Sequence, residues 1–108
     1  MVYEVRIYHI ALGKRKELED RFQQVTFPLF EKHGIDVCDY WLDETGKTLC
    51  YVCRFSDAKE RDERWEQFKT DPKWVEAKAK SEEKGPLVDK LESHVLMRPD
   101  YVKPCWKE

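Results

Sequence analysis

Apolar and polar side chains alternate along residues 2–9, the pattern of a β-strand with two unlike faces. One face would carry Tyr3, Val5 and Ile7, and the other Glu4, Arg6 and Tyr8. We expect the apolar face to meet the core and the polar face to lie on the uncovered side of a sheet.

A helix is expected from about residue 14 to residue 33. Its apolar stripe is formed by Leu18, Phe22, Val25, Leu29 and Phe30. Pro28 lies inside this helix and should kink or split it, because proline lacks the N–H that the α-helix uses. Gly34 follows the last turn, where a helix often ends on a left-handed residue.

Turn and capping residues define the remaining elements. Ser56 or Asp57 can cap one further helix, and Asp71-Pro72 is typical of the start of another. The helices are expected at about residues 57–70 and 72–81, and the strands at 36–43, 48–55 and 90–98. The tail from residue 99 should follow the surface without forming a new element.

The resulting order is strand, helix, strand, strand, helix, strand. This is the ferredoxin-like βαββαβ arrangement of the α+β class, in which helices cover one face of a four-stranded antiparallel sheet. With 108 residues the chain should form one domain. We assign residues 1–100 to that domain and residues 101–108 to a C-terminal extension.

The opposite face of such a sheet has no cover within the chain. Alternation places Tyr8, Asp39 and Trp41 on it. The third strand fits either orientation, and we place Tyr51 and Cys53 on the uncovered face as well. A large exposed apolar patch marks an interaction surface, and its simplest cover is the same face of a second copy. Two sheets packed in this way would enclose a cavity for a small molecule.

Charge and hydropathy exclude several classes of partner. The net charge is -2, and basic residues are interleaved with acidic ones, so the electrostatic footprint of a nucleic-acid-binding protein is missing. No apolar run approaches the length that spans a bilayer, and the N-terminus does not resemble a signal peptide. We therefore expect a cytoplasmic protein that binds neither nucleic acid nor membrane.

The spacing of Cys50 and Cys53 is that of a redox or zinc motif. Strand residues three apart point to opposite faces, however, so this pair is better explained as small residues that pack in a sheet. We expect neither a metal site nor a cofactor.

Five phrases, in this order, resemble the NIPSNAP family of dimeric α+β-barrel proteins. They are Tyr3-Glu4-Val5-Arg6-Ile7-Tyr8, Phe27-Pro28-Leu29-Phe30-Glu31-Lys32-His33-Gly34-Ile35, Trp41, Asp71-Pro72-Lys73-Trp74, and Glu92-Ser93 followed by Leu96-Met97-Arg98-Pro99. The resemblance extends from about residue 2 to residue 100 and implies a homodimer. The chain departs from the family at Tyr51 and Cys53, where His and Trp are frequent.

The resemblance implies no settled activity, because relatives in the wider superfamily include cofactor-free monooxygenases, haem-degrading enzymes, chlorite dismutases and small isomerases. We predict a homodimer that binds a small organic molecule, an anion among the options. If the chain is an enzyme, the expected chemistry is cofactor-independent oxygenation or isomerisation. A non-catalytic binding or scaffold protein is the first alternative, and a haem-binding or haem-degrading protein the second.

Specific residues would carry these roles. Arg6 would hold an anion, Tyr8 would donate a hydrogen bond to it, and Glu4 or His9 would move a proton. The residues expected to line the cavity are Trp41, Tyr51, Asp39 and Cys53. For Trp41 and Tyr51, plain packing in the dimer core remains an equal alternative.

Overall fold

A computed structural model of the chain describes residues 1–104. In chain order the elements are β1 (Val2–Ile10), α1 (Arg15–Arg21), the π-helical segment η1 (Phe22–Thr26), α2 (Phe27–His33), β2 (Asp36–Leu42), β3 (Thr48–Phe55), α3 (Ala58–Thr70), α4 (Pro72–Ser81) and β4 (Val88–Leu96). The expected order of elements is confirmed. The last strand begins and ends two residues earlier than predicted.

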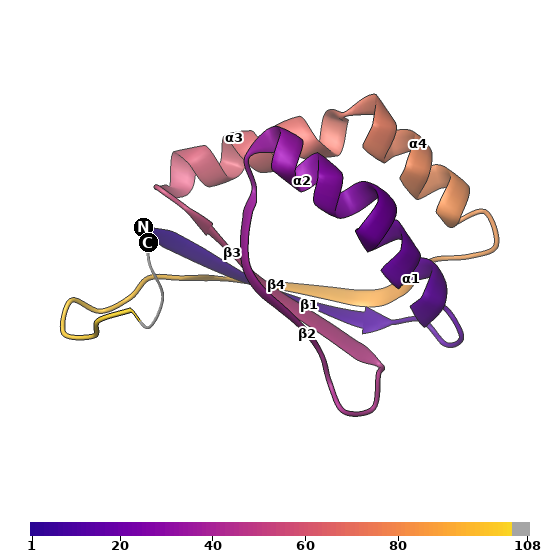
Figure 1. Ribbon diagram of the computed structural model, residues 1–108, viewed down its shortest axis with the longest axis horizontal. Helices are drawn as coiled ribbons and strands as arrows, with labels where there is room; N and C mark the ends of the chain where they lie inside the picture. Colours follow the sequence, from indigo (N-terminus) through magenta and orange to yellow (C-terminus); the bar gives the residue numbers. More distant parts are fainter. Residues whose placement is uncertain (105–108) are drawn as a thin grey trace.

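The strands form one antiparallel sheet in the order β2-β3-β1-β4, which is the ferredoxin-like arrangement. All helices lie on the same side of this sheet, as Figure 1 shows. The predicted fold class is therefore confirmed. The dimeric barrel stays a prediction, because the structure contains one chain.

The helical segment between β1 and β2 is divided next to Pro28, as the sequence predicts. The backbone N–H of Phe27 donates to the carbonyl of Phe22, five residues earlier, so a π-helical turn separates α1 from α2. Pro28 then lies in the first turn of α2, where a missing N–H costs little. The helix stays continuous in direction, and its register shifts by one residue.

The helix ends are fixed by the residues that the sequence indicates. Gly34 has a φ of 69°, and the N–H groups of Gly34 and Ile35 donate to the carbonyls of Glu31 and Phe30. The Asp57 and Asp71 carboxylates cap α3 and α4. The predicted C-cap of α2 and both helix starts are confirmed.

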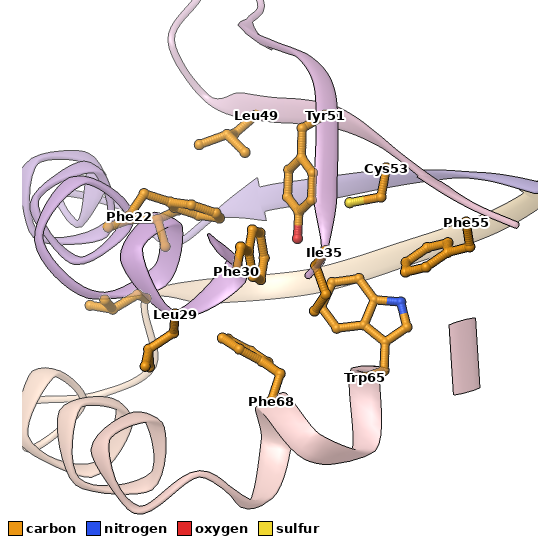
Figure 2. Close-up of a cluster of buried hydrophobic side chains, with 12 residues drawn as sticks. Phe22, Leu29, Phe30, Ile35, Leu49, Tyr51, Cys53, Phe55, Trp65 and Phe68 are labelled. Atoms are coloured by element: carbon orange, nitrogen blue, oxygen red, sulfur yellow. The ribbon is translucent and has the colours of Figure 1, made fainter. Parts of the chain in front are cut away.

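The core lies between the helices and the sheet. Figure 2 shows the ring of Tyr51 pointing from β3 toward Phe30 and Trp65. The side chains of Leu49, Tyr51 and Cys53 are completely buried in this cluster. The expectation that Tyr51 and Cys53 lie on the uncovered face is therefore wrong.

The orientation of β1 is also the reverse of the predicted one. Its residue Glu4 is completely buried and bonds to α3, so Glu4, Arg6 and Tyr8 face the helices. Val5 and Ile7 then lie on the uncovered face. The reversal has a physical reason, because α3 supplies polar partners that pair the charges of β1 as they are buried.

The segment after β4 contacts the start of β1. The guanidinium of Arg98 lies over the ring of Tyr3, 5.3 Å from its centroid, and helps to bury that ring. Residues 105–108 of the expected C-terminal extension lie outside the described residues. Within residues 1–104, none of the helices is both long and apolar enough to span a membrane.

We predict that Gly34→Ala destabilises the protein more than Gly13→Ala does. Both glycines have left-handed φ angles, but the Nη1 of Arg64 occupies the space of an added Cβ at Gly34, whereas Gly13 faces open space. The Gly13 variant should lose about 1 kcal/mol of unfolding free energy, and the Gly34 variant about 1 kcal/mol more, because Arg64 loses its bonds to the Gly34 and His33 carbonyls. Urea denaturation measures both. Equal losses would contradict a stabilising role for Arg64.

Candidate functional site

The site is organised around the buried carboxylate of Glu4. Its Oε1 accepts hydrogen bonds from Arg61 Nε at 2.6 Å and Trp65 Nε1 at 2.8 Å, both from α3. Its Oε2 accepts bonds from Arg6 Nη1 at 2.9 Å and from Ser93 Oγ of β4 at 2.6 Å. One side chain therefore ties β1 to a neighbouring strand and to the helical layer.

These contacts keep Glu4 ionised. Burial alone would raise its pKa, but the hydrogen bonds from Ser93, Arg61, Arg6 and Trp65 outweigh burial and lower the pKa from 4.5 to about 2. All four donors are already in place, so this carboxylate is suited to holding Arg6 in position and poorly suited to moving a proton.

Arg6 is held from three sides. Besides its ion pair with Glu4, its Nε donates to the Tyr51 hydroxyl at 3.0 Å and its Nη2 to the Tyr8 hydroxyl at 3.4 Å. Its guanidinium also lies 4.4 Å from the centre of the Trp65 ring. Burial by itself would lower the pKa of Arg6, but the surrounding tyrosines and Glu4 raise it, so the cation is permanent.

Tyr8 and Tyr51 form a pair of phenols beside this cation. Their hydroxyl oxygens are 2.8 Å apart, and their rings pack with Phe22. Burial raises the pKa of Tyr51 well above its ordinary value, so this hydroxyl stays protonated. Arg6, Tyr8 and Tyr51 therefore form a hydrogen-bonded group around one fixed cation.

A cavity of about 490 Å³ lies on the helix side of the sheet, next to Arg6 and Tyr8. We call it the helix-side pocket. Both aromatic and charged side chains line it. Its lining residues are Arg6, Tyr8, Arg21, Phe22, Thr26, Phe30, Trp65, Phe68, Lys69, Trp74, Lys78, Glu82, Val88, Asp89, Lys90 and Leu91.

Two residues that line this pocket each have a buried polar atom without a hydrogen-bond partner in the described part of the chain. Among the described residues, Arg21 Nε and Thr26 Oγ1 are the buried side-chain nitrogen and oxygen atoms that lack a partner. Their residues are only 8% and 3% exposed. Native proteins rarely leave such groups unsatisfied, so each one calls for an explanation.

The predicted site residues separate into two groups. Glu4, Arg6, Tyr8, Tyr51 and Cys53 lie on the helix side of the sheet, and Arg6 and Tyr8 line the pocket. Burial raises the pKa of the Cys53 thiol far above its ordinary value, which disfavours a reactive thiolate at that position.

The second group lies on the uncovered face. His9 follows Tyr8 in β1 and points the other way, where its Nε2 is 2.6 Å from Glu92 Oε2. Trp41 pairs with Cys50 and is 47% exposed, and Asp39 is exposed beside it. His9 therefore does not meet Arg6 and Tyr8 in one site, which corrects the predicted catalytic set.

No group of three or more His, Cys, Asp or Glu side chains within residues 1–104 is arranged to hold a metal ion. The three histidines lie away from the helix-side pocket: His9 and His94 flank Glu92, and His33 contacts Asp71 at 2.7 Å. In the part of the chain that the structure describes, the pocket wall thus offers no imidazole.

Arg21 and Thr26 line the pocket but were not among the residues predicted from the sequence. A signal for Arg21 was present, because it follows Leu18 by three positions and precedes Val25 by four, and so lies within the apolar stripe of the first helix. A charged residue in such a stripe is either paired or exposed to a cavity. Thr26 gave no comparable signal.

We predict that Glu4→Gln lowers stability and flattens its dependence on pH. The depressed pKa means that the carboxylate stabilises the folded state fully above pH 4.5 and loses this contribution as the pH falls toward 2. The variant should lose about 3 kcal/mol at pH 7 and vary less with pH between 5 and 2. Urea denaturation across this pH range measures the effect, with the exposed Glu44→Gln as the control. Parallel pH profiles for wild type and Glu4→Gln would contradict the assignment.

The fold is shared with several solved structures. An uncharacterized NIPSNAP domain protein from Burkholderia xenovorans is 19% identical with a TM-score of 0.80, over 96% of this chain and 100% of that one. A NIPSNAP family protein from Agrobacterium tumefaciens has the same identity and TM-score, over 93% and 94% of the two chains. A proposed antibiotic biosynthesis monooxygenase from Nitrosomonas europaea is 6% identical with a TM-score of 0.66, over 91% and 98%.

These low identities establish the fold and leave the activity open. No curated protein sequence matches the chain. The NIPSNAP family model matches residues 3–102, which is nearly the whole sequence. The chain therefore belongs to the NIPSNAP family.

Proposed function

We propose that this NIPSNAP-family protein binds a small organic molecule in the helix-side pocket. The observation that carries the proposal is a cavity of about 490 Å³ whose lining combines aromatic rings with charged side chains. Pockets for small molecules typically measure about 300–1,000 Å³ and combine apolar walls with a few polar groups. The binding site lies within one chain, under the helices, and not between two sheets as the sequence suggested.

The lining favours a molecule with an apolar or aromatic body. Rings of Phe22, Phe30, Phe68 and Trp74 form much of the wall. Phe68 and Trp74 pack against each other with centroids 4.6 Å apart, which fixes the orientation of that side. Stacking and edge contacts with these rings would supply most of the affinity.

The charges around the pocket favour an anion. Its described lining contains five basic side chains and two acidic ones. A concave site with an excess of one charge attracts ligands of the opposite charge. The histidines are remote from the pocket, which favours an organic anion over haem as the occupant.

Tyr8 is the group through which catalysis would act. It lines the pocket, and its hydroxyl belongs to the chain of hydrogen bonds that ends at the Arg6 cation. A phenol beside a fixed cation can stabilise negative charge that develops on a bound substrate. Oxygenation or isomerisation of an ionisable substrate is therefore the reaction type to examine first, with binding as the step that must precede it.

We propose further that the protein is a homodimer through the uncovered face of the sheet. With β1 oriented as found, that face carries Val5, Ile7, Val52 and the half-exposed Trp41. This apolar strip, which shares the face with the polar His9, Glu92 and Asp39, supports packing against a second copy.

We expect Leu91→Trp to block binding. Leu91 lines the pocket and is 46% exposed, so a larger ring there can fill the mouth without disturbing the core. A panel of aromatic acids and their neutral analogues, followed by ligand-observed NMR, should show binders whose affinity falls about tenfold or more in the variant. Leu12→Trp adds the same ring on an exposed turn and should bind normally. Unchanged affinity in Leu91→Trp would place the binding site elsewhere, and a panel without binders would refute the proposed function.

A separate experiment addresses the dimer. The wild type should have twice the chain mass in native mass spectrometry, and Trp41→Glu should weaken association about 30-fold or more, because a central aromatic residue often dominates an interface. Leu12→Glu is the control with the same change of charge at a site 96% exposed. A monomeric wild type would refute the dimer and leave the pocket proposal intact.

A further inference from the structure

The helix α4 is packed less firmly than the helices beside it. Among the helices of residues 1–104, α1, η1, α2 and α3 each contain buried residues, whereas α4 contains none. Trp74 packs against the core, with its ring centroid 4.6 Å from that of Phe68, but Trp74 is itself only half-buried. Segments with few buried apolar contacts open locally at a low cost in free energy. In the helical layer, α4 is therefore the element best suited to move.

Two fixed points flank α4. At its start, the buried Asp71 carboxylate accepts a hydrogen bond from Lys32 Nζ at 2.8 Å, lies 2.7 Å from His33 Nε2 and caps the helix. Beyond its end, Leu87 is buried, and its carbonyl accepts a backbone hydrogen bond at 2.9 Å from the turn after β1. A movement of α4 can therefore be confined to residues 72–86.

The backbone at both ends of this segment suits a hinge. Asp71 has a ψ of 124°, which separates α3 from α4, and Pro72 lacks the N–H that would continue the helical hydrogen bonds. Gly85 has a φ of 117°, and the space where a side chain would lie is open. Hinges are typically a few residues at the ends of elements that absorb changes in φ and ψ.

Two hydrogen bonds hold the C-terminal end of α4 against the first helix. Arg21 Nη1 donates to Ser81 Oγ at 3.1 Å and to Glu82 Oε2 at 3.3 Å. The Trp74 ring lies 5.0 Å from the guanidinium carbon of Arg21. Arg21, Trp74 and Glu82 all line the helix-side pocket, as does Lys78 of α4. Because the contacts that hold α4 belong to the pocket wall, their separation would widen the access to the cavity.

We propose that α4 is a lid of the helix-side pocket. It swings about Asp71 and Pro72, and its Ser81 and Glu82 end moves away from Arg21 when a ligand enters or leaves. The inference rests on the proposed function and deepens it by naming the element that controls access to the site. A bound molecule that packs against the α4 wall gains these contacts only in the closed position, so it favours closure.

Native-state hydrogen exchange of the free protein tests the mobility of α4. Peptides from residues 72–83 should exchange about 100-fold faster than peptides from α3, because a local opening is sufficient. Low concentrations of urea should leave exchange in α4 nearly unchanged, since this opening exposes little surface. Equal protection of α4 and α3, with the same dependence on urea, would overturn the lid, because α4 would then open only when the whole chain unfolds.

Two variants weaken the contact that closes the lid. Glu82→Gln removes the negative charge that Arg21 approaches, and Ser81→Ala removes the other acceptor without a change of charge. Each should speed exchange in α4 about tenfold and leave α3 unchanged. Glu83→Gln is the matched control, because Glu83 is exposed and lies outside the pocket lining. Exchange in α4 that both variants leave unchanged would overturn the role of the Arg21 contact, and thermal unfolding shows that each variant is folded.

A ligand probe connects the lid to the pocket. At ten times its Kd, 2-naphthoate should slow exchange in α4 about tenfold and leave α3 unchanged. Ser81→Ala should raise the association and dissociation rates of 2-naphthoate together, about tenfold each, with little change in affinity, because opening precedes both steps. NMR line shapes give these rates.

The outcomes separate this inference from the proposed function. Binding of 2-naphthoate that leaves exchange in α4 unchanged would overturn the lid and keep the pocket. If 2-naphthoate does not bind and another member of the aromatic panel does, that molecule replaces it as the probe. If the whole panel has no binder, both proposals fall. The wild-type exchange comparison decides even if a variant fails to fold.

Discussion

The buried carboxylate of Glu4 is the interaction on which the rest of the structure depends. A charge without solvent must be paired and hydrogen-bonded, and Glu4 receives four donors from β1, β4 and α3. Glu4 can reach the donors of α3 only if its side of β1 faces the helices. Once Glu4 faces the helices, alternation carries Arg6 and Tyr8 to the same side, and the wall of the pocket follows.

The same constraint gives the sheet an unusual division of polarity. Its covered face contains a charged cluster, and its uncovered face contains Val5, Ile7 and the exposed Trp41. Val5 and Ile7 of β1 therefore do not belong to the core cluster of this chain, which is built largely from aromatic rings of β3 and the helices. One strand therefore contributes to two surfaces, the pocket on the covered side and an apolar strip on the uncovered side.

The fold could be read from the sequence because local signals were sufficient for it. Gly34, Asp57 and Asp71 end or begin helices through bonds to residues at most five positions away. The face of β1 could not be read in the same way. Period-two alternation distinguishes two sides without saying which is covered, and the partners that decide, Arg61 and Trp65, lie 57 and 61 residues from Glu4. The separation of Tyr8 from His9, in contrast, follows from alternation itself, because adjacent strand residues point to opposite faces.

The π-helical turn explains why the pocket was harder to predict than the fold. A search for helical periodicity assumes 3.6 residues per turn, and η1 departs from this rule between Phe22 and Thr26. The shift rotates Thr26 into the wall that already contains Arg21, so two polar side chains five positions apart come to share one cavity. Pro28 is compatible with this turn, because it lies in the first turn of α2, where a missing backbone N–H does not remove an α-helical hydrogen bond. The sequence predicts a kink or break at this proline, and in the folded chain Pro28 follows the place where the helix changes register.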